Sequence, residues 1–336
     1  MPGPLRKHRA NVRIVLADKD SYMRQGLRNA LAAEGYRDIR TIRRVSLLRG
    51  ILAASQPDLL ILDTDTDGDA IELVTAIRNN ILGKNPFLPI ILVISGSEAA
   101  TVNYAANSGA DLILMKPFSP AQLFRRIERL VAARMPFIVT PHYTGPDRRG
   151  LDRSGNVRRY DVPNTLKDKL EGQPTDPAAL TDQIEKSVRQ INSGRLEQMA
   201  ITLAQHVEEA CVASETNAEH DSVEEALSLV IRISERIRSS ATDEITGLCA
   251  SLTKVAETIL ADVNATNMKK ELKLLRQLAQ SAVLVANPDL DASAAIDDIT
   301  RAIERYAPKR PDLAAPQQGA ASNAVRARTM PERSLA

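Results

Sequence analysis

The chain has 336 residues, enough for two domains of ordinary size, and a formal net charge of +2 that gives no general affinity for nucleic acid. Its two cysteines do not form a disulfide framework, and aromatic residues make up only 3% of the sequence with no tryptophan, which argues against a base-stacking surface. The basic N-terminus lacks the long apolar core of a signal peptide and no stretch reaches the length of a membrane span, so we expect a cytoplasmic protein.

Residues 1–11 are predicted to be disordered, and residues 12–134 alternate between the patterns of buried strands and amphipathic helices. The predicted strands are 12–17, 37–42, 58–63, 89–95 and 111–116, and the predicted helices are 21–34, 45–54, 69–81, 98–108 and 119–134. Short runs of Val, Ile and Leu are typical of parallel strands that are buried on both faces. We therefore predict an α/β domain with a doubly wound, five-stranded parallel sheet.

The composition changes after this domain. Residues 135–177 are rich in Pro, Gly, Arg and Asp and are predicted to be a linker or arm. Residues 178–306 carry apolar stripes at helical spacing, which predict an all-α helical bundle. The first stripe is Leu180, Ile184, Val188 and Ile191, and the last is Ile296, Ile299 and Ile303. Residues 307–336 are predicted to be a disordered tail.

Four predicted strands lead to residues suited to phosphoryl chemistry. VRIVLA is followed by Asp18, DLLILD ends at Asp63, IILVIS ends at Ser95, and DLILMK ends at Lys116. Ligands of open α/β sheets bind outside the carboxyl ends of the strands, so these side chains are expected to meet at one edge. A carboxylate accepts a phosphoryl group in a covalent intermediate, and a lysine neutralises its charge. Each residue alone has a simpler interpretation, such as helix capping, but the ordered set indicates a phosphoryl-transfer site.

Through the motifs IVLADKD, PDLLILD, IILVIS and DLILMKPF, residues 12–134 resemble the receiver domain of bacterial two-component response regulators. The resemblance implies a phosphoprotein that takes a phosphoryl group from a histidine kinase or a phosphotransfer protein. It implies that Asp63 is the phosphoacceptor and that Ser95 and Lys116 contact the phosphate. It also implies Mg²⁺ as cofactor, held by Asp18, Asp63 and the backbone carbonyl of Asp65.

The sequence departs from the family's pattern at three places. Lys19 stands where the family has a second acid, and a lysine cannot bind Mg²⁺, although its ammonium group could pair with Asp63 instead. Asp20 is the nearest other acid, but it falls at the first position of the helix rather than at the ligand position. The loop after the phosphoacceptor reads TDTDGDA, which lacks the family's Met-Pro and adds negative charge. Ile113 stands where the family often has an aromatic switch residue on the fifth strand.

The helical half shows no catalytic or metal-binding cluster, so we expect no enzyme and interpret it as a module that binds a protein partner. The first hypothesis is a phosphorylated response regulator that signals through this module, with the face of helix 4, strand 5 and helix 5 as the first candidate surface for a homodimer. The second is a pseudo-receiver scaffold that takes no phosphate. The third is a DNA-binding transcription regulator that uses the arginines of residues 143–159 or an unrecognised pair of helices. Acids interrupt those arginines, so nucleic acid is not the expected partner.

Overall fold

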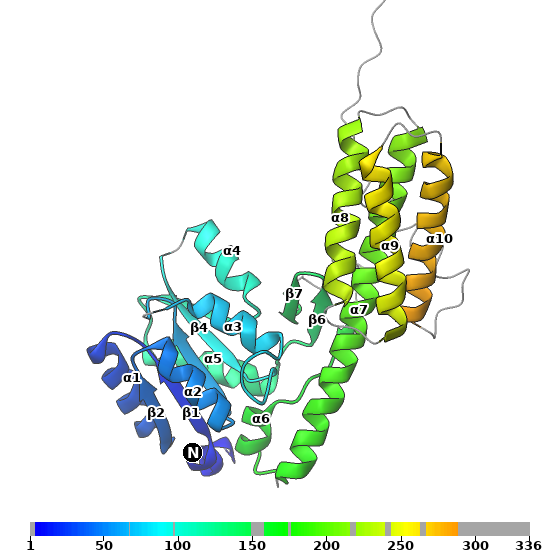
Figure 1. The fold of residues 1–336 in the computed structure, drawn as a ribbon. Helices are drawn as coiled ribbons and strands as arrows, with labels where there is room; N and C mark the ends of the chain where they lie inside the picture. Colours follow the sequence, from blue (N-terminus) through cyan, green and yellow to red (C-terminus); the bar gives the residue numbers. More distant parts are fainter. Residues whose placement is uncertain are drawn as a thin grey trace, which may run out of the picture.

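The computed structural model describes residues 4–66, 68–96, 98–148, 158–173, 176–215, 220–238, 243–262 and 267–287. They form a five-stranded sheet with helices on both faces, a small three-stranded sheet beside it, and a group of long helices (Figure 1). The fold therefore has an α/β part and an all-α part, as the sequence predicts.

The large sheet contains β1 (Arg13–Ala17), β2 (Asp38–Ile42), β3 (Leu59–Asp63), β4 (Ile90–Ser95) and β5 (Leu112–Lys116), in the parallel order β2-β1-β3-β4-β5. One face is covered by α2 (Val45–Ala54), α3 (Ala70–Arg78) and α4 (Ala99–Asn107). The other face is covered by α1 (Ser21–Ala33) and α5 (Pro120–Ala132). Every residue of β3 is buried, because helices cover both of its faces. The structure confirms the predicted doubly wound fold, with the strand order of flavodoxin-like proteins.

Residues 4–11 correct the prediction of a disordered N-terminus, because they form a 3-10 helix, η1 (Pro4–Asn11), that packs against α6 (Thr165–Leu170). The Arg9 guanidinium pairs with the Glu34 carboxylate and lies 5.5 Å from the centre of the Tyr36 ring. These partners lie at the end of α1, so the composition of the first eleven residues could not reveal them.

Residues 135–177, predicted to be a linker or arm, contain regular structure. The strands β6 (Phe137–Thr140), β7 (Tyr143–Pro146) and β8 (Arg159–Tyr160) form an antiparallel sheet in the order β7-β6-β8. These strands are too short to show a clear period-two pattern in the sequence. The small sheet shares an apolar core with the α/β part and with the long helix that begins at Pro177. This core contains Phe87, Phe137, Val139, Tyr160, Ile184 and Ile191.

The helical part consists of α7 (Pro177–Glu215), α8 (His220–Arg238), α9 (Asp243–Ala261) and α10 (Met268–Ala286). The first half of α7 packs on the small sheet, and its second half enters the bundle, where α8, α9 and α10 lie beside it (Figure 1). The structure thus confirms the predicted helical bundle. The last predicted stripe, which begins at Ile296, and the predicted tail lie outside the described residues. Within the described residues, no helix has the length and apolar character needed to cross a membrane.

Candidate functional site

The carboxyl edge of the large sheet brings together the four residues singled out in the sequence. Asp63, Ser95 and Lys116 are the last residues of β3, β4 and β5, and Asp18 directly follows β1. Ser95 is paired in register with Lys116, so the two strands end at the same level. Asp18 and Asp63 are buried, with 2% and 1% of their surface exposed. The parallel sheet therefore places two buried carboxylates, a hydroxyl and an ammonium group at one edge.

Lys116 provides the positive charge of the site. Its ammonium group pairs with the Asp63 carboxylate, and its Nζ lies 3.9 Å from Oδ2 of Asp65. Burial by itself would lower the pKa of Lys116, but the hydrogen bond to Asp63 and the charges of the neighbouring aspartates together raise it. Lys116 is therefore protonated at neutral pH and is in contact with the carboxylate of Asp63, which the family resemblance implies to be the phosphoacceptor.

Asp18 is under electrostatic strain. Its Oδ1 accepts a hydrogen bond of 2.8 Å from the backbone N–H of Asp20, which favours the charged carboxylate. Burial acts in the opposite direction, and with the negative charge of Asp63 it raises the pKa of Asp18 to about 6. The two buried carboxylates therefore carry more negative charge than Lys116 alone neutralises.

The side chain of Asp65 also belongs to the site, although the sequence pointed only to its backbone carbonyl. The Ser95 hydroxyl donates a hydrogen bond to the Asp65 carboxylate, and the backbone N–H of Asp65 donates to Oδ1 of Asp63 at 3.2 Å. Because Lys116 also lies near this carboxylate, Asp65 stands between the hydroxyl and the ammonium group. An alternating acidic loop gave no indication of which of its carboxylates would turn inward.

Lys19 and Asp20 do not take the places that a metal ligand would need. Lys19 is exposed and forms no ion pair with any residue that the structure describes; the Asp63 carboxylate, with which it could have paired, is paired with Lys116 instead. The Asp20 carboxylate caps α1, accepting hydrogen bonds from the backbone N–H groups of Tyr22 at 2.8 Å and Met23 at 3.3 Å.

Mg²⁺ is commonly held by one or two carboxylates together with several water molecules. Asp18 and Asp63 supply two carboxylates whose mutual repulsion a divalent cation would relieve, so the donor set fits this ion. Over the described part of the chain, no group of three or more His, Cys, Asp or Glu side chains could hold a metal ion. A cation at this edge would therefore depend on two carboxylates, with backbone and water oxygens completing its shell.

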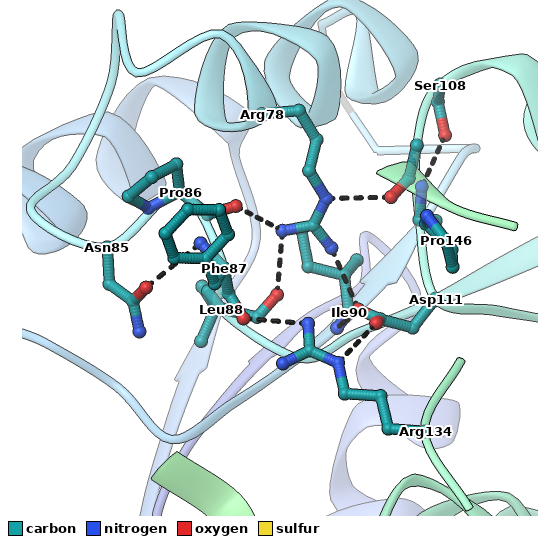
Figure 2. A network of polar contacts seen from close by, with 12 residues as sticks. Arg78, Asn85, Pro86, Phe87, Leu88, Ile90, Ser108, Asp111, Arg134 and Pro146 are labelled. Carbon is teal, nitrogen blue, oxygen red and sulfur yellow. Dashed lines mark hydrogen bonds and ion pairs between the residues drawn. The ribbon is translucent and has the colours of Figure 1, made fainter. Parts of the chain in front are cut away.

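A second charged cluster, which the sequence analysis missed, lies at the opposite edge of the sheet, where β4 and β5 begin. Figure 2 shows the guanidinium groups of Arg78 and Arg134 directed at the carboxylate of Asp111. Arg78 Nη2 lies 2.8 Å from Asp111 Oδ2, and Arg134 Nε lies 2.7 Å from Asp111 Oδ1. The backbone N–H of Ile90 donates to the same carboxylate at 2.8 Å. We call Arg78, Asp111 and Arg134 the arginine cluster.

The arginine cluster joins the large sheet to the small one. Its two guanidinium groups donate further hydrogen bonds to the carbonyl oxygens of Pro86, Phe87, Leu88, Gly109 and Pro163. Each guanidinium lies 5.2 Å from the centre of the Phe137 ring, at the start of β6. Burial lowers the pKa of Arg78 to about 10, against the opposing charge of Asp111, so the group stays protonated at neutral pH. Because these side chains are buried and paired with one another, we assign the arginine cluster a structural role.

Helix α7 is held at the same edge of the sheet. Arg195 Nη2 donates to Asn79 Oδ1 at 3.0 Å and to Thr144 Oγ1 at 2.7 Å. Asn79 is the residue after α3, and Thr144 belongs to β7. The guanidinium group of Arg195 therefore links α7 to the end of α3, which covers the large sheet, and to β7 of the small sheet.

Comparison with known proteins supports the interpretation of the α/β part. Residues 14–128 match the family of response regulator receiver domains. The KDP operon transcriptional regulatory protein KdpE of Escherichia coli is 32% identical over 117 residues, which cover 34% of this chain and 48% of that protein. The transcriptional regulatory protein GltR of Pseudomonas aeruginosa is 33% identical over 119 residues, covering 35% and 48%. These matches span about half the length of each relative.

Among solved structures, the signal receiver domain of a response regulator from Bermanella marisrubri is 26% identical, with a TM-score of 0.32, and the match covers 35% of this chain and 97% of that one.

Proposed function

We propose, from the premise that residues 14–128 are a response regulator receiver domain, that the chain is a response regulator phosphorylated on Asp63. The phosphoryl donor is a histidine kinase or a phosphotransfer protein. The helical bundle passes the state of the receiver to a protein partner, and the chain has no enzymatic output of its own. The observation that carries this proposal is the contact between Lys116 and the buried carboxylate of Asp63, beside a second buried carboxylate at Asp18.

The described side chains divide the work of phosphoryl transfer among them. An Asp63 oxygen attacks the phosphorus, so that an O–P bond forms while the N–P bond of the donor's phosphohistidine breaks and the imidazole leaves. The ammonium group of Lys116 then pairs with the oxygens of the new acyl phosphate. The Ser95 hydroxyl donates a hydrogen bond to Asp65 in the structure, and after phosphorylation it can donate to a phosphate oxygen instead. Such an exchange of partners gives the receiver two states.

Mg²⁺ would be held by Asp18 and Asp63, and it would neutralise the negative charge that phosphoryl transfer brings to this edge. Asp18 and Asp63 are close enough for the charge of one to raise the pKa of the other, and this proximity supports the assignment. We include the backbone carbonyl of Asp65 as the third protein ligand, as the family resemblance implies.

The test is the mass of the intact protein after incubation with acetyl phosphate, with and without Mg²⁺. We expect a phosphoryl-sized gain that requires Mg²⁺, is lost in Asp63→Asn and persists in the control Asp182→Asn, an exposed position on α7. Asp63→Asn breaks the ion pair with Lys116 but leaves the carboxylates of Asp18 and Asp65 beside its ammonium group, so we expect the variant to fold, which circular dichroism checks. A gain of mass that survives in Asp63→Asn would show that another residue is the acceptor.

A pseudo-receiver scaffold is the alternative, and one observation favours it. Lys19 stands where the family has a second acid, so one carboxylate that could hold Mg²⁺ is missing. If folded wild-type protein gains no mass from acetyl phosphate or from a phosphorylated cognate kinase, the scaffold replaces our proposal.

Transcription regulation is a further candidate, because the two relatives described above are named as transcriptional regulatory proteins. An affinity for duplex DNA that falls steeply with salt would support it, whereas the proposed protein-binding output predicts no such affinity. Homodimerisation through α4, β5 and α5 would be seen as a mass increase in light scattering after phosphorylation.

A further inference from the structure

A hollow of about 530 Å³ lies between β8 and α7. Its lining residues come from positions 158–161 and 189–193, far in sequence from Asp63. Its lining contains three arginines, Arg158, Arg159 and Arg189, and one carboxylate, Asp161. Small-molecule sites in proteins usually measure about 300–1,000 Å³, so the size is that of a ligand site. The lining therefore has an excess of positive charge in a space large enough for a small molecule.

Two walls of the hollow are fixed by packing. The Tyr160 ring is buried in β8, and its hydroxyl lies so close to α7 that a Cβ added to Gly194 would be 1.8 Å from it. Arg159 Nε is held 2.9 Å from Oδ2 of Asp147, a carboxylate that is 1% exposed. Strand and helix are thus pinned together beside the hollow, and Arg159 is pre-positioned.

The other two arginines are only loosely paired. Arg158 lies 3.9 Å from Glu197 with 70% of its side chain exposed, and Arg189 lies 3.7 Å from Glu185 with 68% exposed. Exposed pairs at such distances contribute roughly 0–1 kcal/mol, so a stronger anion can displace the glutamates. The guanidinium carbon of Arg158 also lies 5.7 Å from the centre of the Tyr160 ring, so its charged group lies beside the wall of the hollow.

The helix adds neutral donors beside these charges. Gln190 and Ser193 line the hollow together with Arg189, and positions 189 and 193 lie one above the other on the same face of α7. In the described part of the chain, neither the Gln190 amide nor the Ser193 hydroxyl has a side-chain hydrogen-bond partner. Guanidinium groups match phosphate oxygens with two parallel hydrogen bonds, and an amide and a hydroxyl can complete such a set.

We propose that this hollow is a binding site for a small molecule that carries a chain of phosphates, such as an oligophosphate or the phosphate tail of a nucleotide. Two loosely paired guanidinium groups, Arg158 and Arg189, with Arg159 beside them on Asp147, favour several phosphates over a single carboxylate, and the volume accommodates them. The site is a hollow between a strand and a helix rather than an extended basic face, which favours a small ligand over a nucleic-acid duplex. A bound anion bridges β8 and α7 and so stabilises the junction between the receiver and the bundle.

The experiment titrates the full chain with sodium triphosphate, ATP and adenosine by isothermal calorimetry at low salt. We expect triphosphate and ATP to bind and to raise the melting temperature, and adenosine alone not to bind. Tighter binding of ATP than of triphosphate would identify a nucleotide ligand, and equal binding an oligophosphate ligand. Arg158→Gln combined with Arg189→Gln should weaken binding by at least about tenfold.

Two further variants separate a shaped site from general surface charge. The pair Arg28→Gln and Arg125→Gln removes the same charge from exposed positions on α1 and α5, and it should leave binding within about twofold of the wild type. Ser193→Phe keeps the charge but fills the hollow, and it should abolish binding while circular dichroism shows a folded helix. The proposal fails if no phosphate probe binds, if both arginine pairs have the same effect, if Ser193→Phe binds normally, or if duplex DNA binds more tightly than triphosphate.

Discussion

The two edges of the receiver sheet handle buried charge in opposite ways. At the carboxyl edge, Asp18, Asp63 and Asp65 face a single ammonium group, that of Lys116, and the pKa of Asp18 is raised to about 6. At the amino edge, two arginines enclose one carboxylate, Asp111, and donate further hydrogen bonds to backbone carbonyls. The first edge has negative charge left to bind a cation or to react. At the second edge, the guanidinium groups already have carboxylate and carbonyl partners.

The difference shows that buried charges in one sheet can have two roles, to bind and react at one edge and to hold the fold together at the other. A cluster with surplus negative charge gains free energy when a cation binds to it, because the cation relieves the repulsion between the carboxylates. At the amino edge the surplus positive charge of the two arginines is hydrogen-bonded to backbone carbonyls, and removal of Asp111 would leave both guanidinium groups without their carboxylate. Strands β4 and β5 begin at the arginine cluster and end at the carboxyl edge, so the amino edge positions Ser95 and Lys116 for the reactive edge.

The largest expected effect is at the amino edge. Asp111→Asn replaces the carboxylate between two guanidinium groups by an amide whose N–H groups face them. Loss of one partner from a buried charge network costs about 3–5 kcal/mol, so we expect a fall of that size in the free energy of unfolding. Urea denaturation would measure it, with Asp182→Asn as an exposed control. A fall of less than about 1 kcal/mol would mean that water reaches the cluster and screens it.

A smaller loss is expected where α7 meets the small sheet. In Gly194→Ala the new Cβ would lie 1.8 Å from the Tyr160 hydroxyl, so helix or strand must shift. Overpacking of this kind costs about 1–3 kcal/mol. Tyr160→Phe removes the nearest atom and should recover part of the loss when the two changes are combined. Thermal unfolding of the single and double variants measures this, and strictly additive losses would contradict the contact.

At the carboxyl edge we expect the free energy of unfolding to rise, rather than fall, when a charged side chain is removed. Asp18 has an ordinary pKa of 3.8 and a pKa of about 6 in the folded protein, so the folded state binds the proton more tightly. Stability of the metal-free wild type therefore falls as pH rises from about 4 to about 6 and stays low above that. With allowance for solvent screening, Asp18→Asn should add about 1–2 kcal/mol at pH 8 and nothing at pH 4.

Urea denaturation in EDTA at both pH values tests the sign. Mg²⁺ should raise the stability of the wild type at pH 8 and leave Asp18→Asn unchanged. An equal gain from Asp18→Asn at both pH values would assign the effect to packing instead of charge.

The smallest effect concerns the exposed lysine beside Asp18. Lys19→Asp adds an acid at the position where the family has one, and Mg²⁺ affinity should rise by about tenfold, or 1.4 kcal/mol. Calorimetric titration with Mg²⁺ measures it, with Lys84→Asp as a control of equal charge change at an exposed position between α3 and β4. If Lys19→Asp and Lys84→Asp bind Mg²⁺ equally, the Asp65 loop sets the affinity and Lys19 has no direct part.

Two aspartates show how far sequence reasoning extends. Asp58 and Asp111 both stand directly before an apolar strand, and each accepts a backbone N–H of the neighbouring strand at 2.8 Å, from Arg13 and Ile90 respectively. A sequence pattern can suggest that shared local role. It cannot suggest the two guanidinium groups around Asp111, because Arg78 and Arg134 lie 33 and 23 residues away in the chain.

The sequence by itself determined the order of strands and helices, the doubly wound sheet, and the meeting of Asp18, Asp63, Ser95 and Lys116 at one edge. Those features depend on hydrophobic periodicity and on parallel strand direction, which are local properties of the chain. Only the tertiary structure decided that Lys116 rather than Lys19 takes the Asp63 carboxylate, that Asp65 turns inward to Ser95, and that residues 4–11 are ordered. These outcomes depend on contacts between residues far apart in sequence, whose geometry no local pattern encodes.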